Sequence, residues 1–164
     1  MSEMVVQLSK DFVRVAKRLA ARAKKNGILP PVIAIGRGRA EASDGFVVVS
    51  VPAAHEGEVV AGFDPAKLKA THGAEVGTNG HVVQQGERVA GAQRLKAWPD
   101  FGPRAEAQGI PFRVEPQLLI DALDAFPKNG STVRVYLPSE PGQPVVILGS
   151  NGERALLMPQ EEVQ

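Results

Sequence analysis

A basic face on the first predicted helix is the strongest chemical feature of the sequence. On a helical wheel drawn for residues 10–25, seven cations share an arc of roughly 160°. They are Lys10, Arg14, Lys17, Arg18, Arg22, Lys24 and Lys25. Phe12, Val13 and Leu19 lie on the opposite side, and only Asp11 interrupts the basic side. A rigid strip of cations can follow the phosphates of a polyanion, because each neutralised phosphate releases condensed counterions. An ordinary solvated helix face is the simpler interpretation, and both stay open here.

Residue types that are typical of catalytic or metal sites are sparse. The three histidines, His55, His72 and His81, have no acidic partner at the spacing of a metal site or a catalytic triad. The glycine- and arginine-rich segment 36–39 joins two predicted strands and precedes no helix, so it predicts a hairpin with exposed arginines and not a phosphate-binding loop. We therefore predict no catalytic residue, no metal site and no cofactor, and a protein that is not an enzyme.

Composition sets broader bounds. The chain has 164 residues, of which 43% are hydrophobic and 23% charged, so it can form one compact domain and part of another. It has no cysteine, no signal-peptide pattern and no apolar run of membrane-spanning length, which predicts a cytoplasmic protein. The net charge is +1, but residues 1–110 carry 15 Lys/Arg against 11 Asp/Glu, and residues 111–164 carry 4 against 7. Positive potential is therefore expected only in the first part of the chain.

Turn signals divide the chain into short segments. Asn-Gly pairs begin at Asn26, Asn79, Asn129 and Asn151, and an Asp-Gly pair begins at Asp44. Strands are predicted at 4–8, 32–35, 46–51, 81–84, 88–93, 132–137, 145–148 and 154–158. Helices are predicted at 10–25, 65–71 and 116–126, the second with Asp64 as its N-cap and a proline at its first position.

These elements form a recurring unit of a strand, a helix and two or three antiparallel strands. The unit occurs at 4–51, in compressed form at 59–97, and again at 111–158. It predicts the fold class α+β, with antiparallel sheets and helices packed on one face. The predicted organisation is a domain at 1–103 with two units, a half-domain at 110–160, a proline- and glycine-rich linker at 98–109, and a tail at 161–164. The lone Trp98 is expected to fill the joint between the two parts, and stacking on a base is its alternative role.

Four segments of the sequence together resemble segments of the bacterial DNA polymerase sliding clamp, the beta subunit of the replicative polymerase. The sequence Ala-Ser-Asp-Gly-Phe at 42–46 is similar to a strand turn of its second domain, and Trp-Pro-Asp-Phe at 98–101 to the junction of its second and third domains. Asp-Pro-Ala-Lys-Leu at 64–68 resembles the start of the second helix of a clamp domain, and 112–159, ending in Met-Pro, resembles the last half-domain.

The resemblance implies a clamp-like fold of repeated strand-helix-strand units and a non-catalytic processivity factor for DNA replication. The seven cations of 10–25 would contact duplex DNA without reading its sequence, and Lys67 and Lys69 match that role weakly. The helix 116–126 contradicts it, because its polar face carries Gln117, Asp121 and Asp124.

The resemblance also implies an apolar cleft that binds short peptides of polymerases and repair proteins. The residues it places near the cleft are Ser43, Gly45, Phe46, Val48, Pro99, Met158 and Pro159. Ordinary structural roles compete with this assignment: Gly45 as a hairpin glycine, Phe46 and Val48 as strand core, and Met158 as packing.

The chain departs from the family in length. Clamps of the family have three domains, each with two copies of the unit, whereas this sequence has about three copies in all. A ring would require several subunits that share half-domains, so a homo-oligomer is expected. The alternative is an interaction module or regulator on a clamp-like fold that does not encircle DNA.

Overall fold

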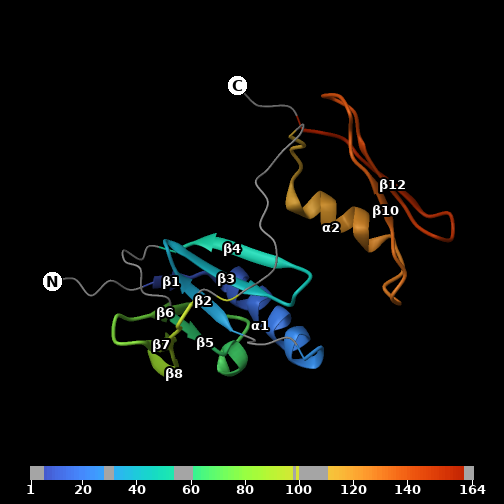
Figure 1. Ribbon diagram of the computed structural model, residues 1–164. Coiled ribbons are helices and arrows are strands. Elements are labelled where there is room, and N and C mark those ends of the chain that lie inside the picture. The colour runs from blue at the N-terminus through green and yellow to red at the C-terminus, as the bar shows by residue number, and fades with distance from the viewer. Residues whose placement is uncertain (1–5, 28–31, 54–60, 98, 100–110, 161–164) are drawn as a thin grey trace. The chain divides into compact units, whose positions relative to one another are not determined.

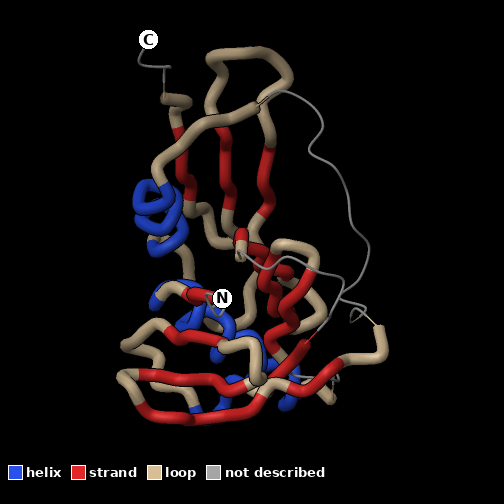
Figure 2. The backbone as a smooth tube through the Cα atoms, turned by 90° about the vertical axis from the view of Figure 1, so that its left-hand side faces the viewer, coloured by secondary structure: helices blue, strands red, loops and turns tan. Residues whose placement is uncertain are grey.

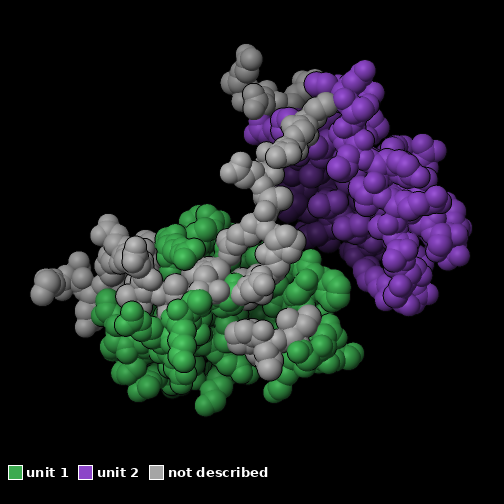
Figure 3. All heavy atoms as spheres, viewed as in Figure 1, with its two compact units in different colours: residues 1–104 green, residues 105–164 purple. Residues whose placement is uncertain are grey.

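The computed structural model describes residues 6–27, 32–53, 61–97, 99 and 111–160 (Figure 1). The chain divides into two compact units, unit 1 at 1–104 and unit 2 at 105–164 (Figure 3). The predicted tail, His55, Trp98 and, apart from Pro99, the predicted linker lie outside the described residues. None of the described helices has both the length and the apolar character needed to cross a bilayer.

Helix α1 (Lys10–Lys25) has the predicted bounds, and its end signals explain them. Ser9 is the N-cap, and its Oγ accepts a hydrogen bond from the Phe12 N–H at 3.1 Å. The helix ends at Lys25, Asn26 is its C-cap, and Gly27 follows in the left-handed region at φ 68°. The residues of α1 that are buried are Phe12, Val13, Ala16, Leu19, Ala20 and Ala23. They pack on β3 (Arg39–Ser43) and β4 (Val48–Pro52), so the predicted apolar side of the helix is confirmed as its core side.

Unit 1 contains two antiparallel sheets (Figure 2). The first has the order β1-β6-β7-β8, with β1 (Val6–Leu8), β6 (Ala74–Val76), β7 (His81–Gln84) and β8 (Glu87–Gly91). The second has the order β4-β3-β2-β5-β9, in which β2 (Ile33–Gly36), β5 (Ala61–Phe63) and β9 (Gln93–Arg94) join β3 and β4. The segment 36–39 forms the β2–β3 hairpin with exposed arginines, as predicted. The sequence pattern did not predict β5 or β6, and it gave no bounds for β3, although the hairpin predicted at 36–39 requires a strand after it.

Two repeats of unit 1 exchange their first strands. The first repeat consists of β1, α1 and β2 to β4, and the second of β5, the 3₁₀ turn η1 (Pro65–Lys67) and β6 to β8. Strand β1 of the first repeat pairs with β6 of the second, and β5 of the second pairs with β2 of the first. Both repeats contribute side chains to one hydrophobic core, which includes Leu8, Leu19, Ile35, Phe63 and Val82. Neither repeat has a complete sheet of its own.

The predicted helix at 65–71 is wrong, because only the single turn η1 forms. Asp64 caps this turn as predicted, and its Oδ1 accepts from the Ala66 N–H at 2.8 Å. The turn stops at Leu68, and the Lys69 N–H donates to Oε1 of the buried Gln84 at 2.7 Å. Gln84 Nε2 donates to the Lys69 and His72 carbonyls at 2.8 and 3.0 Å. The buried Gln84 side chain of β7 thus forms hydrogen bonds with backbone N–H and C=O groups that would be paired within a longer helix.

Unit 2 contains helix α2 (Pro116–Asp124) and an antiparallel sheet of order β10-β11-β12. The strands are β10 (Arg134–Tyr136), β11 (Val145–Leu148) and β12 (Arg154–Leu157), and α2 covers one face of the sheet (Figures 1 and 2). The core is small, with Phe126, Val145, Ile147 and Leu157 buried. Residues 111–115, where the repeat predicts a first strand, belong to no sheet. The described chain is therefore a mixed α and β structure with antiparallel sheets.

Candidate nucleic-acid interface

All seven predicted cations lie outside the buried side of α1. Six are exposed and Lys17 is half-buried. Because the core residues fix the rotation of the helix about its axis, the basic face cannot turn inward without exposing Phe12 and Leu19. The sequence therefore gives α1 a fixed cationic surface.

Three of these cations form ion pairs or hydrogen bonds within the protein. Arg14 forms an ion pair with Asp11 at 3.0 Å, one turn away on the same helix. Lys17 Nζ donates to the carbonyl oxygen of Ala66 at 3.2 Å and to that of Leu68, so it ties α1 to the end of η1. Arg22 Nε donates to Asp44 Oδ2 at 2.9 Å. Their charges are partly neutralised or committed to the fold, so their contribution to phosphate binding is reduced.

The other four cations are available for an external anion. Lys10, Arg18, Lys24 and Lys25 make no ion pair or hydrogen bond with another described residue. Lys24 and Lys25 are also in the last turn of α1, where positive charge interacts favourably with the helix dipole. The dipole accounts for cations at that end of the helix but not for Lys10 in the first turn, where it is unfavourable.

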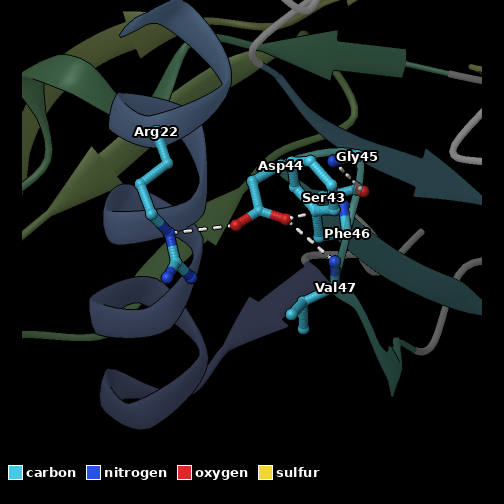
Figure 4. Close-up of polar contacts among 6 residues, drawn as sticks. All are labelled: Arg22, Ser43, Asp44, Gly45, Phe46 and Val47. Atoms are coloured by element: carbon cyan, nitrogen blue, oxygen red, sulfur yellow. Dashed lines mark hydrogen bonds and ion pairs between the residues drawn. The ribbon is translucent and has the colours of Figure 1, made fainter. Parts of the chain in front are cut away.

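The turn between β3 and β4 is organised by Asp44 (Figure 4). Its Oδ1 accepts from the N–H groups of Phe46 and Val47 at 2.9 and 2.8 Å. Ser43 Oγ accepts from the Gly45 N–H at 3.0 Å, and Gly45 has φ 90°, a conformation that favours glycine. The sequence correctly predicted a hairpin glycine here, but it gave no role to Asp44.

Asp44 also connects this turn to α1. Its side chain is 4% exposed and pairs with Arg22 on the helix. Burial acts to raise the pKa of Asp44, but hydrogen bonds from Val47 and Phe46 and the Arg22 charge outweigh it, so this pKa lies below its ordinary value of 3.8. The Asp-Gly pair and a basic helix were visible in the sequence, but their contact depends on how the helix packs on the sheet.

The turn leaves an apolar patch in solvent. Phe46 is 85% exposed, and Val47 and Val48 are close to half exposed. The expectation that Phe46 and Val48 form strand core is wrong, because the Asp44 hydrogen bonds hold Phe46 in the turn and β4 begins only at Val48. The structure brings together four of the predicted cleft residues: Ser43, Gly45, Phe46 and Val48.

The remaining predicted cleft residues lie elsewhere in the chain. Pro99 is half-buried next to residues that are not described, and Met158 and Pro159 follow β12 in unit 2. Met158 is exposed, so it does not act as packing within the described part of unit 2. Assembly of these residues with the β3–β4 turn stays a prediction.

Helix α2 presents the acidic polar face that the sequence predicted. Gln117 donates to Asp121 at 2.7 Å, and Asp124 pairs with Lys128 at 2.8 Å. All four side chains are exposed. Among the described residues, no three of the His, Asp and Glu side chains come together as metal ligands. His72 and His81 instead hydrogen-bond neighbouring Thr71, Gln85 and Asn79 side chains.

Comparisons of the chain with protein-family models, with curated proteins and with solved structures found no match.

Replacing Asp44 by asparagine tests the link between α1 and the turn. The amide side chain would keep one acceptor but lose the charge, so we expect Asp44→Asn to lower the free energy of unfolding by about 1–2 kcal/mol at pH 7. Because the pKa of Asp44 is lowered by folding, its charge stabilises the native state above pH 3.8 and progressively less below it. Urea unfolding at pH 7 and at successively lower pH should show the gap between wild type and variant closing. A gap that stays constant into acid would contradict this role.

Proposed function

We propose that this protein is a non-catalytic DNA-associated factor of sliding-clamp type, which binds duplex DNA through the basic face of α1 and docks partner peptides near the β3–β4 turn. The observation that carries the proposal is the set of four unengaged cations on the outward face of a helix whose rotation is fixed by its core. Such a face suits the phosphate backbone, whose charge is regular and independent of sequence.

The architecture of unit 1 supports the clamp-like interpretation. Two strand-helix-strand repeats share one core and exchange strands. Their helical elements α1 and η1 lie together, with Lys17 bridging them, and Lys67 on η1 is exposed. Retention on DNA by such a protein needs no chemical step, only a surface that holds the duplex by its charge.

A second candidate function is a protein-interaction module on the same fold that does not encircle DNA. The exposed Phe46 patch and the acidic polar face of α2 favour it. Partner capture that is lost in Phe46→Asp but unaffected by loss of the α1 cations would identify this function.

A salt titration tests DNA binding directly. If four cations of α1 contact phosphates, the logarithm of the duplex affinity should fall with the logarithm of the salt concentration with a slope of about −3.6, or about 100-fold between 50 and 200 mM. Fluorescence anisotropy with two duplexes of unrelated sequence should give equal affinities and equal slopes. The absence of duplex binding at low salt would eliminate the proposal, and a strong preference for one duplex would contradict the phosphate-only mode.

A further inference from the structure

We propose that two copies of the chain associate through unit 2, and that each copy pairs with the open strand edge of the other. The inference extends the expected homo-oligomer to a specific interface and does not depend on DNA binding. It starts from the count of repeats. Unit 1 has two repeats that complete each other, whereas unit 2 has one, which we call the third repeat: residues 111–115, α2 and β10 to β12.

Unit 1 shows how repeats of this chain combine. The second strand of each repeat, β2 or β6, pairs antiparallel with the first strand of the other, β5 or β1. On its other side β5 pairs with β9, the segment that follows β8 of its own repeat. The result is the strand order β4-β3-β2-β5-β9.

The third repeat has the same parts. Residues 112–116 read Phe-Arg-Val-Glu-Pro, and residues 61–65 around β5 read Ala-Gly-Phe-Asp-Pro. In both segments the first and third residues are apolar, the fourth is the N-cap of the following helical element, and the fifth is a proline at its first position. The Arg113 carbonyl accepts from the Gln160 N–H at 2.9 Å, and Gln160 follows β12 just as β9 follows β8. The segment 112–114 therefore holds the position relative to Gln160 that β5 holds relative to β9.

The counterpart of β2 in the third repeat is β10, and it is the edge strand of its sheet. Val135 on β10 pairs in register with the buried Ile147 of β11, yet Val135 itself is 50% exposed. In unit 1 the corresponding inward residues Ile33 and Ile35 are buried beside β5. The third repeat thus has an open strand edge at the place where a first strand of another repeat is bound in unit 1.

Helix α2 also has an apolar flank that no other described element covers. On α1 the flank that lies against η1 carries Lys17, Ala20 and Lys24. Counted at 100° per residue from its core side, which Ala122 marks, the same flank of α2 carries Leu119 and Leu123. Both are exposed, at 38% and 39%. The flank of α2 is therefore apolar, whereas the corresponding flank of α1 carries two lysines and an alanine. Such an apolar flank is suited to contact with the same flank of a second α2 helix.

A second copy of the chain can cover both the open edge of β10 and the exposed flank of α2. Two third repeats related by a two-fold axis would each give residues 112–114 to the other's β10 and would place the two α2 flanks side by side, which makes the surface self-complementary. Of the twelve exposed large hydrophobic side chains among the described residues, nine are in unit 2.

Light-scattering mass measurements on the full chain, over a dilution series, test the interface. The wild type should have twice the 17.4 kDa of one chain. Leu119→Glu combined with Leu123→Glu should weaken the dimer at least about 100-fold. The matched control is Leu156→Glu, which adds a charge at an exposed position of β12, the far edge of the sheet, and should leave the dimer intact.

A cysteine placed on the α2 flank gives a second readout that does not require a destabilising change. The chain has no cysteine, so Leu123→Cys introduces a single thiol, and mild oxidation should produce a covalent dimer, whereas Leu156→Cys should not. A monomeric mass with no cross-link through Leu123→Cys would overturn the proposal and point to cover of this flank within one chain. A dimer that survives the double glutamate variant would overturn it as well, because the contact would then lie elsewhere. Duplex binding with a monomeric mass would refute this inference alone.

Discussion

Replacing Arg18 and Lys25 by glutamate is expected to lower duplex affinity at least about 50-fold at 0.1 M salt, because each phosphate contact contributes about 8-fold there through counterion release. Both side chains are exposed and make no hydrogen bond or ion pair with another described residue, so the effect on folding should be small. The slope of log affinity against log salt should also become shallower by about 2. Anisotropy titrations at three salt concentrations would measure both quantities.

The control must change net charge equally without touching α1. Arg88→Glu combined with Arg154→Glu does so at exposed positions of β8 and β12. It should reduce affinity only a little, through the weaker long-range field. Equal losses in the two double variants would mean that net charge governs binding and that α1 has no special role.

Leu19→Ala is expected to lower the free energy of unfolding of unit 1 by about 3–5 kcal/mol, more than a 100-fold change in the folding equilibrium. Leu19 is 1% exposed and lies in the core that both repeats of unit 1 share. Truncation leaves a cavity between α1 and the sheets, which the neighbouring side chains fill only in part. Guanidinium unfolding followed by circular dichroism would measure the loss.

Val47→Ala is a suitable comparison for that experiment. Val47 is close to half exposed in the β3–β4 turn, and its N–H, which holds Asp44, does not depend on the side chain. Its truncation should change stability by less than about 0.5 kcal/mol. A Leu19→Ala variant no less stable than Val47→Ala would contradict the assignment of the core side of α1.

The sequence was most informative where a signal is local. The 3.6-residue period of 10–25, with Ser9 before it and Asn26-Gly27 after it, is enough to predict the helix, its bounds and its basic side. The Asp44-Gly45 turn and the β2–β3 hairpin follow from turn chemistry in the same way. The mixed α and β class with antiparallel sheets follows from the alternation of these elements.

The features that were not predicted depend on partners far along the chain. Strands β5 and β6 have only three residues each and form because distant strands pair with them. The helix predicted after Asp64 stops because Gln84 captures its polar groups. The basic side of α1 could be read from the sequence, but its division into engaged and available cations could not, since Asp44 meets Arg22 only after the helix has packed.

The exchanged first strands of unit 1 have a consequence for how it opens. Because β1 is held by β6 and β5 by β2, releasing either repeat removes a strand from the sheet of the other. Val6 and Val76 meet across some seventy residues of chain, so the pairing gives no local fragment that is stable by itself. We therefore expect unit 1 to open as a single foldon, so that the slowest amides of both sheets exchange through one global opening.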